Sequence, residues 1–344
     1  QVNLGNSDVG GNLNVTATQG NISQSSGTTV AVDGAISLNT NGTDGNASII
    51  SNQQVNLGNS DVGGNLNVTA TDVNINGTVS AANATFQPTI ATSSIGIGIG
   101  DSASSDFKLD ATELSNLESN GTVTIGSNSD MAGDVRINAV DLSNETFNLT
   151  VQGANPAFNG DVDLPKNLNV TATTGDITQG SSDITVNGIA TLQTGTSNDI
   201  TLNNVNNNFN EVVISQAGNV DLNDADDILL KDSTVSGELN LNSNGNAVLG
   251  SATITGNLNV TSNSGEITQN TENDTLIVNG TATLTAGNNQ DITLNNTNNN
   301  FNEVVVTRAR DVALNDTNDI SFSNSNPTLR NLNLSSSNGT IVLG

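Results

Sequence analysis

The chain repeats long stretches of its own sequence. Residues 1–18 (QVNLGNSDVGGNLNVTAT) recur without change at residues 54–71. Further along, residues 199–213 (DITLNNVNNNFNEVV) return as residues 291–305 with one substitution, which defines a unit of about 92 residues. Self-similarity of this kind is typical of stacked-repeat architectures and not of globular enzymes.

Alternation of apolar and polar residues predicts the strands. Leu13 and Val15 flank an Asn, and so do Leu258 and Val260. This period of two indicates a half-buried strand whose aliphatic side chains point inward. The same pattern occurs at Leu66 and Val68, Leu168 and Val170, Leu239 and Leu241, and Leu332 and Leu334. A second aliphatic column is expected from isoleucines that follow a Gly by two residues, namely Ile22, Ile177, Ile267 and Ile341.

The spacing of these strands predicts the fold class. The segments GELNL at 237–241 and GNLNV at 256–260 lie about nineteen residues apart, so one coil takes roughly 20 residues. Strands separated by whole coils pair in parallel, and crossovers between parallel strands are almost always right-handed. We therefore expect an all-β fold, a right-handed parallel β-helix (β-solenoid).

Asn, Asp and Gly are expected at the corners between strands, because they tolerate positive φ and satisfy local backbone groups. The Asn-rich segments 203–210 and 295–302 are predicted to be corners with stacked amide ladders, and Phe209 and Phe301 are predicted to pack in the core or at a corner.

We expect one continuous solenoid with three segments. Residues 1–85 and 166–344 carry regular β-helix repeats, the latter as two copies of the 92-residue unit, and residues 86–165 are less regular. Within the middle segment, residues 111–118 (ATELSNLE) predict a short helix with Asp110 as its N-cap.

Composition excludes several classes of function. The chain has no Cys and no His, so nucleophilic catalysis by a Ser-His or Cys-His pair is excluded. Seven Lys and Arg residues stand against thirty-four Asp and Glu residues, giving a net charge of −27, which argues against nucleic acid and anionic membranes as partners. Apolar runs are too short to span a bilayer. No cofactor and no membrane insertion are expected.

An acidic cluster leaves two interpretations open. Asp221, Asp224, Asp226 and Asp227 offer the hard oxygen ligands that calcium prefers, but the glycine-aspartate nonapeptide of calcium-binding β-rolls is missing. Carboxylates that cap corners and face solvent are the favoured interpretation. We therefore expect no metal site, and these four residues are the candidates should calcium bind.

Three runs resemble the repeats of large bacterial exoproteins of the filamentous haemagglutinin type: residues 95–126, residues 207–230 (NNFNEVVISQAGNVDLNDADDILL) and residues 256–269 (GNLNVTSNSGEITQ). The resemblance implies a right-handed β-helical fibre at the bacterial surface, exported by two-partner secretion and used in adhesion, aggregation or biofilm formation. It implies no catalytic residues. Nothing in this sequence resembles the family's N-terminal secretion domain.

The leading hypothesis is a structural shaft segment of an extracellular adhesin or surface fibre. Its partners would be neighbouring repeats of the same long chain or end-to-end copies of itself. The alternative is a module that binds host or neighbouring-cell glycans on the Asn- and Thr-rich side face. A polysaccharide-acting enzyme comes third, because glycosidases need two carboxylates at a set separation and the chain has no Trp or Tyr to form a sugar platform. We expect no enzymatic activity.

Overall fold

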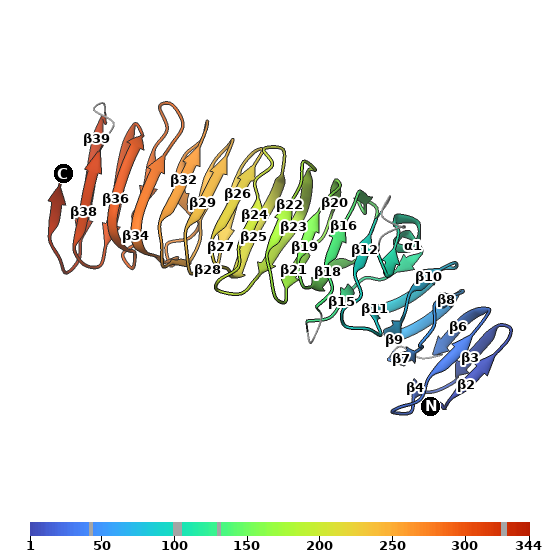
Figure 1. Cartoon of the computed structure of the whole chain (residues 1–344). Coiled ribbons are helices and arrows are strands. Elements are labelled where there is room, and N and C mark those ends of the chain that lie inside the picture. The colour runs from blue at the N-terminus through green and yellow to red at the C-terminus, as the bar shows by residue number, and fades with distance from the viewer. Residues whose placement is uncertain (41–43, 99–104, 129–131, 325–328) are drawn as a thin grey trace. The chain divides into compact units, whose positions relative to one another are not determined.

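A computed structural model describes residues 1–40, 44–98, 105–128, 132–324 and 329–344. It is nearly all β, and its parallel strands stack coil upon coil as a β-solenoid (Figure 1). The predicted fold class is therefore confirmed, while the handedness stays a prediction. The chain divides into two compact units, Gln1–Thr174 and Gly175–Gly344.

The longest sheet of the first unit runs through β3 (Leu13–Ala17), β6 (Ala35–Thr40), β9 (Ser60–Ala70), β11 (Val79–Pro88), β14 (Leu117–Glu118) and β15 (Thr122–Gly126), then β18 (Asn148–Gly153) and β21 (Leu168–Ala172). The other strands of the first unit are β1 (Val2–Leu4), β2 (Ser7–Val9), β4 (Ile22–Gln24), β5 (Val30–Val32), β7 (Ala47–Ile50), β8 (Val55–Leu57), β10 (Val73–Ile75), β12 (Ile95–Ile97), β13 (Phe107–Leu109), β16 (Val135–Ile137), β17 (Val140–Asp141), β19 (Pro156–Phe158) and β20 (Val162–Leu164).

A short helix interrupts the first unit, as expected, but it is shorter than the predicted range. Helix α1 spans Ala111–Ser115 and is followed by strand β14, so Leu117 is buried as a strand residue. Asp110 is the N-cap: its carboxylate accepts from the Glu113 backbone N–H at 2.8 Å, and Glu113 accepts from the Asp110 N–H at 2.8 Å. Glu113 also accepts from the N–H of Ile75 at 3.1 Å, which ties the helix to the solenoid. Residues 99–104 of the run at 95–126 lie outside the described residues.

The second unit contains two long parallel sheets. Sheet I consists of β23 (Ile184–Gln193), β25 (Asn208–Gln216), β27 (Ile228–Lys231), β30 (Ala247–Leu249), β33 (Ile267–Gln269), β35 (Ile292–Leu294), β37 (Asp311–Asp316) and β39 (Asn331–Ser336). Sheet II consists of β22 (Ile177–Gln179), β24 (Ile200–Leu202), β26 (Val220–Asp224), β29 (Leu239–Ser243), β32 (Leu258–Ser262), β34 (Leu276–Thr285), β36 (Asn300–Arg308), β38 (Ile320–Asn324) and β40 (Ile341–Leu343). Strands β28 (Ser233–Val235) and β31 (Ala252–Ile254) pair with each other, and β31 pairs with the first residues of β34.

Aliphatic columns form the core, as the alternation predicted. Leu239 pairs in register with Leu258, and both side chains are buried. The predicted core residues Leu332 and Ile341 are 41% and 39% exposed, and Leu13 and Leu334 are half-buried. All four lie in the first or last coil of the structure, which packs against a neighbouring coil on one side. Phe209 and Phe301 are buried in the core, as expected.

The two copies of the 92-residue unit lie on different sheets. Ile177 of the first copy is in sheet II, where its register column runs up to Leu258, four coils later. Its counterpart Ile267 follows on the next strand, β33, which belongs to sheet I. Correspondingly, β23 of the first copy is in sheet I and its counterpart β34 is in sheet II. The repeat is therefore not a whole number of coils long, and each motif faces a different side in its second copy.

The corner glycines have a different role from the one expected. Gly237 has no positive φ; instead, a Cβ there would lie 2.2 Å from Oδ1 of Asn219 in the preceding coil. That oxygen accepts from the N–H of Glu238 at 2.9 Å. The glycine therefore makes room for a side-chain oxygen that reaches the next coil. The same geometry occurs at Gly265, where a Cβ would lie 2.5 Å from Oδ1 of Asn246. That oxygen accepts from the N–H of Glu266 at 2.9 Å.

The same corner contact recurs in both units. It joins Asn12 to the residue after Gly34, Asn46 to the residue after Gly64, Asn59 to the residue after Gly77, Asn83 to the residue after Gly121, and Asn257 to the residue after Gly280. Among the described glycines, positive φ occurs at Gly20, Gly27, Gly98 and Gly126.

Candidate functional site

The four predicted calcium candidates occupy separate positions. Asp221 accepts from the amide of Asn203 at 2.8 Å, and Asp226 accepts from the amide of Asn208 at 3.1 Å. Asp227 is a corner residue whose Oδ1 accepts from the N–H of Asn246 at 2.6 Å. Within the described residues, no three His, Cys, Asp or Glu side chains come together to hold a metal ion.

Asp224 differs from the other three because it is buried. Its side chain is 3% exposed, and its two oxygens accept from the backbone N–H groups of Phe209 at 2.7 Å and Asp226 at 2.9 Å. Burial raises the pKa of Asp224 to about 7, and the two hydrogen bonds only partly oppose this shift. The counterpart Asp316 accepts from Phe301 N at 2.7 Å and Asn318 N at 2.8 Å, and burial raises its pKa too. The expectation of a solvated corner carboxylate is therefore wrong for Asp224, and its counterpart Asp316 is buried in the same way.

The Asn-rich segments are corners only in part, because residues 208–210 and 300–302 begin strands β25 and β36. Asn207 is fully buried, and its Oδ1 accepts from the Ile184 N–H at 3.0 Å while its Nδ2 donates to the Leu202 carbonyl at 3.0 Å. It also exchanges two hydrogen bonds with Gln179. Asn299 repeats every one of these contacts with Gln269, Leu276 and Leu294. The sequence signal is that a GDITQ or GEITQ segment precedes an NNNF segment in both copies, with the Gln and the bonded Asn 28 residues apart in the first copy and 30 in the second.

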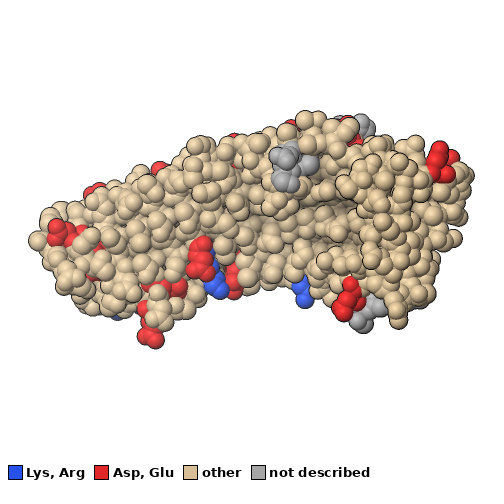
Figure 2. Space-filling model, turned by 90° about the horizontal axis from the view of Figure 1, so that it is seen from below, with Lys and Arg blue, Asp and Glu red and all other residues tan. Residues whose placement is uncertain are grey.

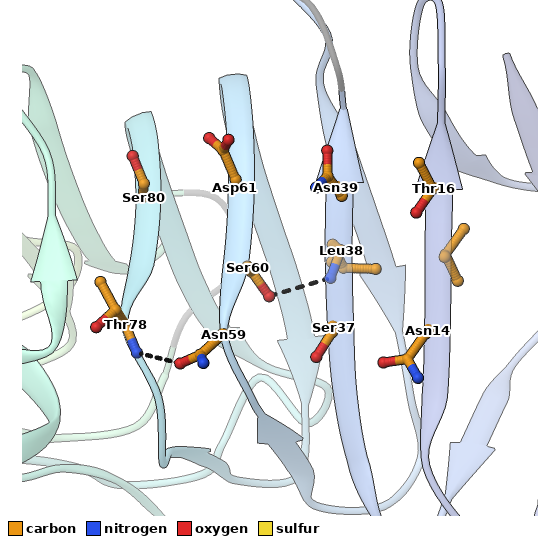
Figure 3. A pocket seen from close by; sticks show the side chains of 11 residues that line it. Asn14, Thr16, Ser37, Leu38, Asn39, Asn59, Ser60, Asp61, Thr78 and Ser80 are labelled. Atoms are coloured by element: carbon orange, nitrogen blue, oxygen red, sulfur yellow. Dashed lines mark hydrogen bonds between the residues drawn. The ribbon is translucent and has the colours of Figure 1, made fainter.

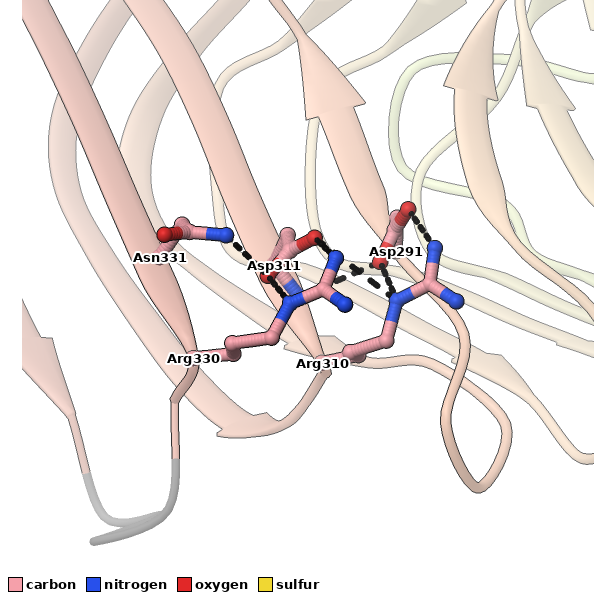
Figure 4. Close-up of polar contacts among 5 residues, drawn as sticks. All are labelled: Asp291, Arg310, Asp311, Arg330 and Asn331. Carbon is pink, nitrogen blue, oxygen red and sulfur yellow. Dashed lines mark hydrogen bonds and ion pairs between the residues drawn. The ribbon is translucent and has the colours of Figure 1, made fainter.

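Arginine replaces the corner glycine in two coils near the end of the second unit (Figure 4). Arg310 stands where the first copy has Gly218, and it holds Asp291 through Nε at 2.8 Å and an NH2 group at 2.5 Å. In the next coil, Arg330 forms the same bidentate contact with Asp311, through Nε and Nη2. The hydrogen bond from Arg330 lowers the pKa of Asp311, and the bond to Asp291 raises the pKa of Arg310. These pairs are partly exposed, so each contributes little to stability.

Charged side chains are otherwise sparse on the surface. On the face seen in Figure 2, Asp and Glu side chains stand singly or in small groups on a surface that is mostly uncharged, and Lys and Arg are few. That face offers no basic field for a polyanion.

A groove on the first unit is lined mainly by Asn, Ser and Thr residues together with Asp61, Val15 and Leu38. It has a volume of about 450 Å³ and crosses strands β3, β6, β9 and β11 (Figure 3). It opens where β6 and β9 are not joined by a regular ladder: the Leu38 N–H donates to the Ser60 hydroxyl at 3.1 Å instead of to a backbone carbonyl. No feature of the sequence alone located this groove.

One register row forms the groove's upper border as drawn in Figure 3. Thr16 pairs with Asn39, Asn39 with Asp61, and Asp61 with Ser80, so four polar side chains stand on four successive strands. Asn14, Ser37, Asn59 and Thr78 form a second row below it.

Most of these side chains are free to bind a ligand. Within the described part of the chain, no hydrogen bond is made by the side chains of Asn14, Thr16, Ser37, Asn39, Asp61 and Ser80. The Asn39 Oδ1 atom is buried and still has no partner. Elsewhere on the same unit, equivalent side chains pair across coils, as Asn74 does with Asn56 at 3.0 Å and Asn83 with Asn65 at 2.9 Å.

Fold and contacts together define a parallel β-solenoid repeat protein whose coils are joined by polar corner contacts. The chain matches a family model described as repeats of unknown function (DUF5649) at residues 1–45, 146–216, 217–248 and 240–308. These matches cover more than half of the chain, which therefore belongs to this family of repeats. No curated protein and no solved structure matches the chain significantly. Among the described residues, no helix is long and apolar enough to cross a membrane.

Proposed function

We propose that this chain is a structural shaft segment of an extracellular bacterial fibre of the filamentous haemagglutinin type. The observation that carries the proposal is the corner contact, in which an Asn or Asp side chain of one coil bonds the backbone of the next. Asn219 to Glu238 and Asn246 to Glu266 are examples in the second unit, and Asn46 to Asn65 is one in the first. Each coil therefore depends on its neighbours, and length is gained by adding coils.

A deletion series tests the shaft role. Removing residues 239–257 takes out one whole coil, because Leu239 and Leu258 are register partners and each follows a Gly by two residues. We expect this variant to fold with nearly unchanged thermal stability and to be shorter by ~4.8 Å. Removing residues 239–248 deletes half a coil and shifts every later side chain to another sheet, so we expect it to aggregate or unfold. Equal behaviour of the two variants would argue against a shaft.

Surface location has its own test. Antibodies raised against the purified chain are expected to label intact cells of the organism that carries the gene, and external protease is expected to remove the label. Labelling that appears only after the cells are permeabilised would overturn the proposed location, and the folding result of the deletion series would still stand.

A further inference from the structure

We infer that the groove crossing β3, β6, β9 and β11 is a binding site for a neutral, linear oligosaccharide that runs across the strands. The first support is its chemistry: the two rows present hydroxyl, carboxamide and carboxylate groups, which are the donors and acceptors that bind sugar hydroxyls. This inference goes beyond the shaft role and does not depend on it.

The second support is the state of the lining groups. Side chains on a solenoid face normally pair across coils, as Asn65 and Asn83 do in this unit. Thr16, Asn39, Asp61 and Ser80 are aligned for the same pairing yet make no side-chain hydrogen bond within the described residues. The buried Oδ1 of Asn39 is an acceptor left without a donor, and such a group is costly unless a ligand or water satisfies it.

The shape of the groove favours an extended chain. Neighbouring strands lie ~4.8 Å apart, so the row from Thr16 to Ser80 spans ~14 Å, enough for several sugar rings. A peptide strand that adds to a sheet edge is a poorer fit, because the groove lies across the face of strands that already pair with one another, β3 with β6, β6 with β9 and β9 with β11.

Charge decides which sugars are suitable. The net charge of −27 and the unpaired carboxylate of Asp61 repel acidic polysaccharides. The same carboxylate is able to accept from two neighbouring hydroxyl groups of a neutral sugar. We therefore assign the groove to neutral saccharides.

Calorimetric titration of the whole chain tests this inference. The probes are cellohexaose, mannohexaose and laminarihexaose, with an oligogalacturonate as the acidic control. We expect saturable binding of at least one neutral hexaose and none of the acidic one. Asp61→Ala and Asn39→Leu are expected to weaken binding about tenfold or more, since each removes a polar partner from the groove.

Asn67→Ala is the matched control, because Asn67 is an exposed residue of the same strand β9 outside the groove. It should leave the affinity unchanged. Asp61 is exposed, so its variant reports on binding even if Asn39→Leu lowers stability. Absence of saturable binding by every neutral hexaose up to about 10 mM, a weak affinity of roughly 3 kcal/mol, would overturn the inference. So would equal affinity of Asp61→Ala and the unchanged chain.

Discussion

Gln179 and Asn207 exchange two amide hydrogen bonds between successive coils. Gln179 Nε2 donates to Asn207 Oδ1 at 2.6 Å, and Asn207 Nδ2 donates to Gln179 Oε1 at 3.0 Å. Gln269 and Asn299 form the same pair at 2.9 Å in both directions. A satisfied amide pair of this kind, with the Asn buried and the Gln half-buried, fixes the path of the chain into β25 and β36. Each Asn also holds the carbonyl that precedes its own turn and a backbone N–H of the preceding coil.

Replacing Asn207 by Ala is expected to lower the free energy of unfolding by about 2–4 kcal/mol. The change leaves the buried N–H of Ile184 and the carbonyl of Leu202 without partners. Asn210→Ala is the control, because Asn210 is exposed in the same segment. Urea unfolding followed by circular dichroism measures both variants, and similar midpoints for the two would contradict the role given to Asn207.

The raised pKa of Asp224 predicts that the free energy of unfolding falls as the pH rises. Its pKa is about 7 in the folded chain, above the ordinary value of 3.8, so the folded state binds the proton more tightly than the unfolded state. Its contribution is present below pH 4 and is lost as the pH rises towards 7, by at most about 4 kcal/mol. Melting temperatures between pH 4 and 8 should therefore fall less steeply for Asp224→Asn than for the unchanged chain. Parallel curves would show that Asp224 does not carry the effect.

Gly237→Ala is expected to be destabilising by about 1–3 kcal/mol although the backbone there needs no positive φ. The new Cβ would displace the Asn219 oxygen and break its bond to Glu238. In the background Asn219→Ala, the same glycine substitution should cost much less, because the oxygen is gone. A double-mutant cycle measures this coupling, and strictly additive effects would be inconsistent with the corner contact.

Leu258→Asp and Asn259→Asp test the register of β32. Leu258 is 1% exposed, so a carboxylate there would be buried without a partner and should cost several kcal/mol. Asn259 lies on the outer face and donates to Asn240 at 2.8 Å, so its replacement should cost only about 1 kcal/mol for that bond. The two melting temperatures should differ clearly.

Calcium is expected to leave the stability nearly unchanged. Asp221, Asp226 and Asp227 already accept hydrogen bonds from Asn203, Asn208 and Asn246, respectively. Millimolar calcium and magnesium should therefore raise the melting temperature by similar small amounts through charge screening. A saturable rise specific to calcium, lost in Asp226→Ala, would instead identify a metal site.

The sequence by itself determined the parts of this protein that depend on near neighbours along the chain. Alternation around Asn259 set which side chains face inward, and Asp110 with Glu113 three residues later set the start of the helix. Repetition at about 20 residues is enough to require parallel stacking, since strands one coil apart have no other way to pair.

Only the tertiary structure decided which residues meet across coils. Asn219 meets Gly237, and Asn207 meets Gln179, because those coils have particular lengths. Insertions change the coil length, so a repeat of about 92 residues does not close on a whole number of coils and its second copy lies on the other sheet. The groove beside Asn39 has the same origin, since it opens where β6 and β9 lose their regular ladder. The alternation of apolar and polar residues specifies whether a side chain points inward or outward. Which residue it meets in the next coil depends on the number and the conformation of all the residues between the two.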